Sequence, residues 1–538
     1  MPSALTYPGV YIEEIPSGVR TITGVATSIT AFVGYTKRGP VNTPTRVQSF
    51  PEFARSFGAL TTKSTMSFAV QQYFLNGGRD ALIVRTVHLT GGGTTAKKGR
   101  LSVGGAGNKE LILDAANEGE WADDLRVRID HDTAPEVPGP ATLFNLSIKD
   151  VGTGVVEVLR NLPPDASLAA LVEQRSTLVR VFDAPSQRPD HHAPIDPGDD
   201  PFDPTKPTRF DPFPDTGVGS GEDGDQVADD LVPVADDGTG VYALARADLF
   251  NLLCIPPYLP ENGVGAGRIL TPAAKGRAAA FCEDHRALFI VDPHPDWAAT
   301  SQITAGSDQL SNYITNISSD DRKNAALYFP YLRAADPLQN DALRAFPPCG
   351  AIAGVMARTD ATRGVWKAPA GLDAGVAGVQ ELRPKLTDGE NGIVNPLGVN
   401  CLRTFPASGT VVWGSRTLAG ADALASEWKY IPVRRTALFL EESLYRGTQW
   451  VVFEPNDAPL WAQIRLNVGA FMNGLFRQGA FAGTTPREAY FVKCDGETTT
   501  QDDVNLGIVN IVVGFAPLKP AEFVVIRLQQ MAGQTGSV

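Results

Sequence analysis

The fold of this chain is decided by three consecutive stretches, LFNLLCI (249–255), TPAAKGRAAAFCEDH (271–285) and ALFIVDP (287–293). The first and third are rich in branched and aromatic residues, which is typical of buried strands. The middle stretch has the composition of a helix, and we expect Thr271 to cap it with Pro272 in its first turn. A strand, a helix and a strand in this order predict a largely parallel sheet with helical crossovers.

The same alternation continues on both sides of these stretches. Residues 81–89, ALIVRTVHL, read as another buried strand, and residues 318–330 and 349–360 continue the series toward the C-terminus. At 538 residues the chain is too long for a single core. We therefore predict an α/β multidomain protein whose central mixed α/β domain comprises residues 21–90 and 241–389.

A β-rich outer module is predicted as an insertion into the central domain, over residues 91–240. Strand-like pieces recur from about residue 94 to residue 180. The remaining tract, residues 181–240, holds 15 Asp or Glu, 3 Lys or Arg and ten prolines. Because it has few large apolar side chains, it cannot bury enough surface to offset its ordering entropy. We predict a long, exposed acidic loop.

The composition excludes several classes of protein. A formal net charge of −13 argues against a general nucleic-acid binder, because phosphate affinity needs a basic surface. Five cysteines without a C-x-x-C pair fit neither a disulfide framework nor a zinc site. No signal peptide is recognisable, and the longest apolar run, residues 508–515, is about half the length that crosses a bilayer. We expect a protein made in the cytoplasm that does not insert into a membrane.

A last unit, an α+β C-terminal domain, is predicted over residues 390–516. A helix around residues 436–447 and a strand at 450–454 precede a second helix, residues 458–478, whose apolar residues recur at helical spacing. The apolar stripe of this second helix should face the core. Its polar side is expected to meet another molecule and consists of Gln463, Arg465, Asn467, Asn473 and Arg477.

Four charged residues face each other across one or two turns of the first of these helices. They are Arg434, Arg435, Glu441 and Glu442. We interpret them as structural ion pairs, formed within the chain or between subunits.

Both ends of the chain carry short apolar segments set off by prolines. The N-terminal arm, residues 1–20, contains a predicted strand of Val10, Tyr11, Ile12, Glu13, Glu14 and Ile15. The C-terminal arm, residues 517–538, contains a predicted strand of Phe523, Val524, Val525, Ile526, Arg527 and Leu528. This second strand is apolar on both faces and must be covered on both. Such detached strands suit pairing with another chain, although periodicity alone favours strands that fold back on the chain's own sheet.

The sequence contains no recognisable fingerprint of catalysis or of cofactor binding. His285, Asp292 and His294 lie at the end of a predicted strand and could form a hydrolytic cluster, but an Asp that precedes a proline is more simply a turn residue. His191 and His192 could collect a metal ion, but an acidic loop of this composition is usually only solvated. We therefore predict no catalytic residue, no metal site and no cofactor.

Several stretches, in the same order along nearly the whole chain, resemble the contractile tail sheath family of phage tails, R-type pyocins and extracellular contractile injection systems. The stretches are YPGVYIEEIPSG (7–18), GGRDALIVRTV (77–87), NEGEWADDLRVRI (117–129), IPVRRTALFLEESLYRGTQWVVFEPNDAPLW (431–461) and GETTTQDDVNLGIVNIVVGFAPLKPAEFVVIRL (496–528). The last two are the most specific. The acidic tract has no counterpart that we can place.

The resemblance implies a structural subunit without catalysis. Family members stack as hexameric rings into a helical sheath around an inner tube, contract to drive the tube through a target envelope, and add their terminal arms to the sheets of neighbours. The implied partners are copies of the chain itself, the inner tube protein, and baseplate and terminal cap proteins. Assembly would take place in the cytoplasm, within a phage tail or phage tail-like particle that can be released from the cell.

The family's architecture also implies which surfaces face which partner. The C-terminal domain would line the inside, with the polar side of the helix 458–478 as the candidate inner-tube contact. The outer module would face solvent, so deletion of residues 185–238 is expected to leave assembly largely intact.

Two other functions stay open from the residues alone. One is an α/β hydrolase-like enzyme that uses the His285, Asp292 and His294 cluster. The other is a non-contractile surface filament whose acidic loop binds calcium. The resemblance does not distinguish a phage from a pyocin or an injection system, nor an extended from a contracted stored state.

Overall fold

A computed structural model of the chain describes residues 20–91, 93–134, 142–214, 217–257, 269–306 and 309–528. The described chain folds into two compact units. The larger unit comprises residues 28–358 and 370–426, and the smaller unit comprises residues 20–27, 359–369 and 427–528.

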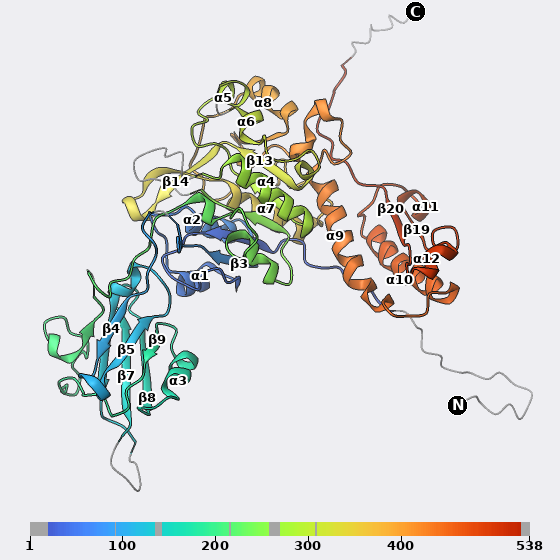
Figure 1. Cartoon of the computed structure of the whole chain (residues 1–538). Coiled ribbons are helices and arrows are strands. Elements are labelled where there is room, and N and C mark those ends of the chain that lie inside the picture. The colour runs from blue at the N-terminus through green and yellow to red at the C-terminus, as the bar shows by residue number, and fades with distance from the viewer. Residues whose placement is uncertain are drawn as a thin grey trace, which may run out of the picture. The chain divides into compact units, whose positions relative to one another are not determined.

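An eight-stranded sheet forms the core of the larger unit (Figure 1). Its strand order is β18-β17-β13-β12-β11-β1-β3-β2, with β2 and β18 antiparallel and the six strands between them parallel. The strands are β1 (Thr30–Gly34), β2 (Thr45–Val47), β3 (Ala81–Arg85), β11 (Leu252–Cys254), β12 (Leu288–Val291), β13 (Ala325–Phe329), β17 (Val399–Phe405) and β18 (Gly409–Val412). Every residue of β1, β3 and β13 is buried, so both faces of the sheet are covered, as parallel strands require.

Helices connect the parallel strands and pack against them. The helix expected after β11 is α4 (Pro272–Asp284), and Thr271 caps it, because its Oγ1 accepts a hydrogen bond from Ala274 N–H at 3.1 Å. The other helices are α1 (Phe50–Phe57), α2 (Met66–Leu75), α5 (Thr300–Thr304), α6 (Leu310–Tyr313), α7 (Cys349–Arg363) and α8 (Asp388–Val394). A separate three-stranded sheet has the order β15 (Ala342–Phe346), β14 (Tyr331–Asp336) and β16 (Glu381–Arg383). The predicted mixed α/β fold class is confirmed.

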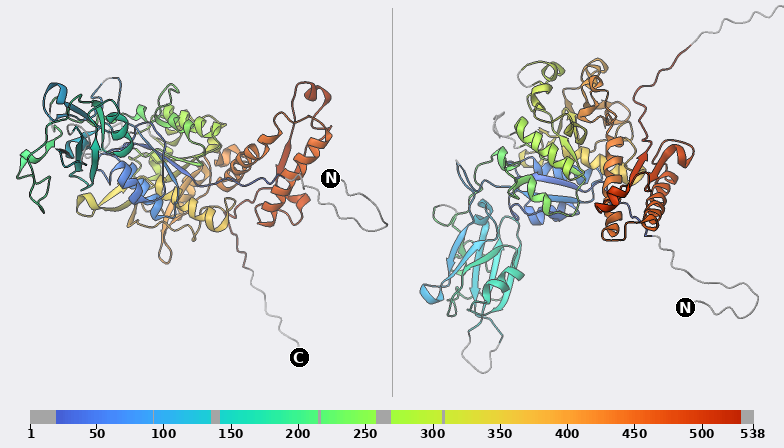
Figure 2. Two further views of the ribbon diagram at one scale, coloured as in Figure 1. Left: turned by 90° about the horizontal axis from the view of Figure 1, so that it is seen from below. Right: turned by 45° about the vertical axis from the view of Figure 1, so that its right-hand side comes forward.

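A β-rich module interrupts the large sheet between β3 and β11, and Figure 2 shows its strands gathered apart from that sheet. One of its sheets has the order β10-β6-β7-β8 and the other the order β4-β5-β9. The elements are β4 (Arg100–Val103), β5 (Leu111–Ala115), β6 (Leu125–Asp130), β7 (Phe144–Asp150), β8 (Val156–Leu162), α3 (Leu168–Arg175), β9 (Val179–Asp183) and β10 (Asp211–Pro212). Side chains from both sheets share one core, which contains Leu113, Val127 and Phe144.

The acidic tract departs from the expectation of a wholly exposed loop. Phe213 is buried in the core of the module, and Leu231 and Val232 are buried in the core of the large sheet. The tract's scattered apolar residues therefore anchor it at intervals. Leu231 and Val232 complete the main core, which weighs against the expectation that deletion of residues 185–238 leaves assembly largely intact.

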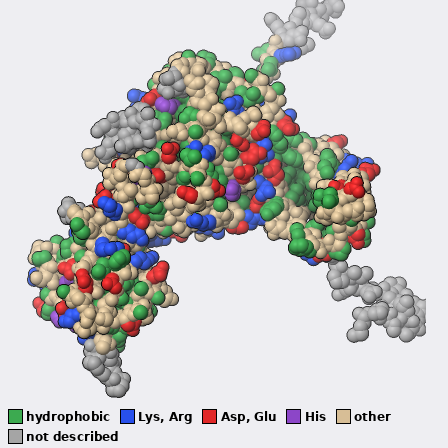
Figure 3. Space-filling view, viewed as in Figure 1, with side chains coloured by type: hydrophobic (Ala, Val, Ile, Leu, Met, Phe, Trp, Pro, Cys, Tyr) green, Lys and Arg blue, Asp and Glu red, His purple; other side chains and the backbone are tan. Residues whose placement is uncertain are grey.

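Many acidic side chains of this tract are paired with cations outside it. Asp223 accepts a hydrogen bond from Lys63 Nζ at 2.6 Å and one from the Tyr35 hydroxyl at 2.6 Å. Glu222 pairs with Lys97 at 2.8 Å. Figure 3 accordingly shows acidic and basic side chains mixed over this face of the molecule instead of one acidic patch. These ion pairs compensate part of the negative charge of the acidic tract, for which the tract itself holds few basic residues.

The smaller unit is built on two long helices and a two-stranded sheet. Its elements are α9 (Ile431–Thr448), α10 (Ala458–Arg477), α11 (Pro486–Ala489), β19 (Tyr490–Lys493), α12 (Gln501–Asn505) and β20 (Val512–Phe515). Asp457 caps α10, since its Oδ1 accepts from Leu460 N–H at 3.0 Å, and Pro459 occupies the first turn. The apolar stripe of α10 faces the core of the unit as predicted.

The strand predicted at 450–454 is wrong. Residues 449–451 form a short 3-10 helix instead. Phe453 has a left-handed φ of 70° and is fully exposed, so this apolar run turns the chain between α9 and α10 and finds no strand to pair with. Among the described residues, no helix is long and apolar enough to span a bilayer.

Candidate assembly interface

The C-terminal segment is exposed from Phe523 to the end of its described length. Residues 521–528 belong to no helix or strand (Figure 1). Between 72% and 94% of the surface of the apolar residues among them is accessible, namely Phe523, Val524, Val525, Ile526 and Leu528. Monomeric proteins rarely expose a contiguous apolar segment of this kind. The predicted N-terminal strand, residues 10–15, lies outside the described residues.

The sheet formed by β19 and β20 is a candidate acceptor for such a segment. It has two strands only, so within the described chain each strand keeps one unpaired edge. Its inner face packs on α10 through Tyr490, Val492 and Phe515, whereas Phe491 and Val512 on the outer face are 50% and 43% exposed. A two-stranded sheet is marginal alone, and a third strand with an apolar face would complete it.

The five polar residues predicted on α10 lie in different environments. Arg477 is exposed, and Gln463, Arg465 and Asn473 are half-buried. The guanidinium of Arg465 donates a hydrogen bond to the main-chain oxygen of Cys494. Asn467 is only 2% exposed, and its Oδ1 accepts a hydrogen bond from Arg20 N–H at 3.1 Å. The expectation that Asn467 meets another molecule is therefore wrong, because the N-terminal segment of the same chain covers it.

The four charged residues predicted to pair on α9 divide between different partners. Arg434 Nη1 lies 3.1 Å from Glu441 Oε1, and Arg446 Nε lies 2.6 Å from Glu442 Oε1. Arg435 turns instead to Asp360 near the end of α7, with Nη1 and Nη2 at 2.9 and 2.6 Å from the two carboxylate oxygens. Each pair forms within one chain.

The Asp360 carboxylate is held in a closed network. It is fully enclosed, with side-chain exposure of 4%, and Thr27 Oγ1 donates to its Oδ2 at 2.8 Å. Burial raises the pKa of Asp360 from its ordinary value, and the guanidinium of Arg435 opposes that shift. A bidentate Arg–carboxylate pair of this geometry fixes the orientation of both groups.

The residues of the alternative hydrolytic cluster are each held by a different partner. Asp292 Oδ1 accepts from Cys349 N–H at 2.9 Å, and burial raises the pKa of this carboxyl to about 7. His285 stacks on Phe281, with 4.0 Å between ring centroids. His294 is buried and its Nδ1 accepts from Asp296 N–H at 3.2 Å. The three side chains thus serve local packing and turns.

The predicted metal candidates are also engaged within the outer module. His192 Nδ1 accepts from Ile129 N–H at 3.0 Å, and its Nε2 lies 3.1 Å from Asp211 Oδ2. His191 packs edge-on against His131, with ring centroids 4.7 Å apart. Within the described ranges, no group of three or more His, Cys, Asp or Glu could hold a metal ion.

Two family models match the chain. The phage tail sheath protein central domain matches residues 271–418, and the phage tail sheath C-terminal domain matches residues 425–531. This chain belongs to the contractile tail sheath family. Its most specific stretches, around α9 and α10 and before the C-terminal arm, lie within the second match.

Individual sheath proteins are similar over different lengths. The tail sheath protein of Burkholderia phage BcepMu is 25% identical over 497 residues, which cover 88% of this chain and 87% of that protein. The tail sheath protein of Enterobacteria phage T4 is 24% identical over 46% of this chain and 37% of its own length.

Solved structures share the fold of this sheath protein. The sheath of the extracellular contractile injection system PVC, solved in the contracted state, has a TM-score of 0.53 and 21% identity and covers 98% of each chain. A sheath tail protein from Listeria innocua has a TM-score of 0.57 and 12% identity, over 93% of this chain and 96% of that one.

Sequence reasoning missed two parts of the sheath protein's candidate interface. The first is the β19–β20 sheet, whose strands are separated by a helix and two turns, so that no hairpin signal marks them. The second is the contact of residues 20–27 with α9, in which Arg435 Nη2 donates to the main-chain oxygen of Thr27, 408 positions away. No local pattern could have indicated a contact at that separation.

Proposed function

We propose that this chain is the subunit of a contractile sheath that stacks as hexameric rings around an inner tube and drives the tube through a target envelope. The observation that carries the proposal is the exposed apolar segment 523–528 in a chain that also presents a two-stranded sheet with unpaired edges. Strand addition between copies would satisfy both at once. Contacts of this head-to-tail kind do not close on themselves and generate helical filaments.

The C-terminal arm is the strand donor for which the structure gives side-chain positions. Phe523 and Val525 point to one side of an extended strand, and Val524, Ile526 and Leu528 point to the other. When the arm pairs with β19 or β20 of a neighbour, one set covers the core beside α10 and the other lies with Phe491 and Val512. Residues 10–15 are the corresponding N-terminal donor, and the breakers at 16–18 and 517–520 let the connected bodies move during contraction.

We propose that the exposed part of α10 contacts the inner tube. Because Asn467 is buried, the remaining candidate residues for this contact are Gln463, Arg465, Asn473 and Arg477. A polar contact suits this task, because the sheath must hold the tube before firing and release it during contraction. Baseplate and terminal cap proteins would bind the two ends of the stack, in a particle assembled inside the cell.

Expression of the full chain and of two truncated chains tests the proposal. The full chain should form tubes that are visible by electron microscopy. Chains without residues 1–17, or without residues 521–538, should stay folded and soluble but form no long tubes. Unchanged tube formation by both truncated chains would refute strand donation.

A further inference from the structure

Residues 20–27, here called the N-terminal strap, lie along one face of α9. Four α9 residues spaced four apart form that face, and successive positions on one helix face recur at this spacing. They are Arg435, Phe439, Ser443 and Gly447. The strap runs in the opposite direction to α9, so its last residue lies near the start of the helix.

The C-terminal end of the strap is fixed by charged groups. Arg435 Nη2 donates to the main-chain oxygen of Thr27 at 2.8 Å, while the same guanidinium holds Asp360. The Thr27 hydroxyl donates to that carboxylate at 2.8 Å. Main chain and side chain of one strap residue are therefore bound by a single buried ion pair.

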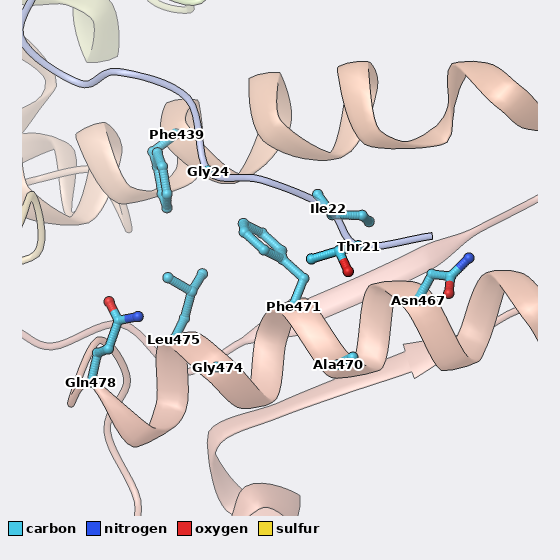
Figure 4. A pocket seen from close by; sticks show the side chains of 10 residues that line it. All are labelled: Thr21, Ile22, Gly24, Phe439, Asn467, Ala470, Phe471, Gly474, Leu475 and Gln478. Carbon is cyan, nitrogen blue, oxygen red and sulfur yellow. The ribbon is translucent and has the colours of Figure 1, made fainter. Parts of the chain in front are cut away.

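The middle of the strap is seated by close approach to the helix. Val25 N–H donates to Ser443 Oγ at 3.2 Å. A Cβ atom added to Gly24 would lie 2.8 Å from Phe439 Cζ, and one added to Gly447 would lie 2.5 Å from Ile22 Cγ2. Figure 4 shows Phe439 and Phe471 directed into the space between the strap and α10. With the native Phe439 and Ile22 in place, neither glycine leaves room for a side chain.

The N-terminal end of the strap is fixed to α10 and to the turn after α9. Arg20 N–H donates to Asn467 Oδ1 at 3.1 Å, and the Arg20 guanidinium lies 4.7 Å from the ring centre of Trp450. The strap is thus bound at both ends and in the middle. Tension along the strap would act on all of these contacts at the same time.

We infer that the strap is the anchor of the N-terminal arm, with Arg435 and Asp360 as the residues that position it. Tension from a neighbouring copy then enters the body through α9 and α10. The strap stays seated throughout contraction. The inference rests on the proposed function, because it assumes that the arm carries tension between copies.

A disulfide between the strap and α9 tests whether the strap stays seated. Ile22 Cβ lies 3.1 Å from a Cβ built on Gly447, close to the spacing of about 3.5–4.5 Å in disulfides. The five native cysteines are buried and should not interfere. In the isolated chain carrying Ile22→Cys and Gly447→Cys, oxidation should give the disulfide in nearly all molecules, as read by mass spectrometry. Absence of the disulfide would overturn the inference.

The same variant, assembled and then oxidised, tests the strap during motion. Oxidised and reduced sheaths should contract to the same final length. If the sheaths form but contract only when they are reduced, the inference is overturned and the proposed function is not. If the unmodified chain forms no sheaths, the proposed function fails, whereas the disulfide in the isolated chain still reports the strap.

Weakening the strap supplies an independent test. Thr27→Val with Ser443→Ala removes two hydrogen-bonding hydroxyls and should leave the isolated chain folded, while mean sheath length falls at least threefold. Thr27→Ser in place of Thr27→Val should restore the length. The control is Thr436→Val, which removes a hydroxyl bond to Pro432 within α9 without touching the strap. Sheaths of unchanged length in the double variant would overturn the inference.

Discussion

The ammonium group of Lys275 lies 3.4 Å from the ring centroid of Tyr313. Lys275 is 2% exposed, and its Nζ donates to the main-chain oxygen of Leu270 at 2.7 Å. The hydroxyl of Tyr313 donates to the main-chain oxygen of Asp292 at 3.0 Å. One tyrosine inside the larger unit therefore contacts both the side chain of a buried lysine and the main chain of a buried aspartate.

Burial lowers the pKa of Lys275 to about 7. Between pH 7 and about 10.5 the unfolded chain binds a proton at this residue that the folded chain does not, so the free energy of unfolding rises with pH in this window. The total rise over these roughly 3.5 pH units is on the order of 5 kcal/mol at about 1.4 kcal/mol per pKa unit. Lys275→Met should abolish this rise, as measured by urea unfolding at pH 7 to 10. Lys206→Met, at an exposed site, is the control and should keep it.

Asp292 predicts the opposite slope on the acid side. Its pKa is raised to about 7 by burial, so between about pH 4 and pH 7 the folded chain keeps a proton that the unfolded chain releases, and the free energy of unfolding falls as pH rises. Asp292→Asn should remove this fall, giving a chain similar to the parent near pH 4 and more stable at pH 7. Asp236→Asn at the surface should behave like the parent. A variant less stable than the parent at pH 7 would contradict this assignment.

Two helical glycines of the smaller unit should respond in opposite directions to the same substitution. Gly474 lines a cavity of about 360 Å³ between α10 and the strap, and a Cβ added there meets no atom within 4 Å. Gly474→Ala should raise the free energy of unfolding by about 1 kcal/mol, because alanine is the better helix former. Gly447→Ala should lower it, because the added methyl group would clash with Ile22. Thermal unfolding of both variants measures the difference.

Two valines of the acidic tract test whether that tract belongs to the folded core. Val232 is fully buried and Val234 is 79% exposed. Val232→Ala should lower the free energy of unfolding by about 2 kcal/mol through lost burial and the cavity left behind. Val234→Ala should have no measurable effect. Equal effects of the two substitutions would mean that the tract does not pack as described.

A charge in the C-terminal arm should separate folding from assembly. Val524 is 80% exposed in the single chain, so Val524→Asp should leave thermal unfolding unchanged. In a paired strand the same carboxylate would be buried without a partner, and tube formation observed by electron microscopy should be lost. Val218→Asp, at a fully exposed site of the outer module, is the matched control and should still form tubes.

The sequence was sufficient where local chemistry determines the structure. Thr271 caps its helix as predicted, because a capping side chain acts within one turn. The branched runs at 249–255 and 287–293 became parallel strands, because both are buried on two sides.

The sequence was insufficient where distant residues decide the outcome. Residues 450–454 have the composition of a strand, but they pair with no strand of the described chain, and the helices on either side turn the chain there. The acidic tract looked too polar to fold, yet Lys63 and Lys97 pair with its carboxylates and Leu231 completes a core formed elsewhere. Asn467 sits on the polar side of its helix by spacing, and only the path of residues 20–27 makes it buried.

The outer module leaves the large sheet after β3 and returns to it at β11, and these two strands flank β1. Arg85, the last residue of β3, is level with Gly34 of β1, and Leu252, the first residue of β11, is level with Thr30. The exit and the re-entry therefore lie at opposite ends of parallel strands, about 16 Å apart for a lateral spacing of about 10 Å and a rise of about 3.3 Å per residue. Many foreign domains have ends that close together. A foreign domain with such ends could therefore replace the module, with Leu231 and Val232 kept in place, and each subunit of the proposed sheath would then carry one copy.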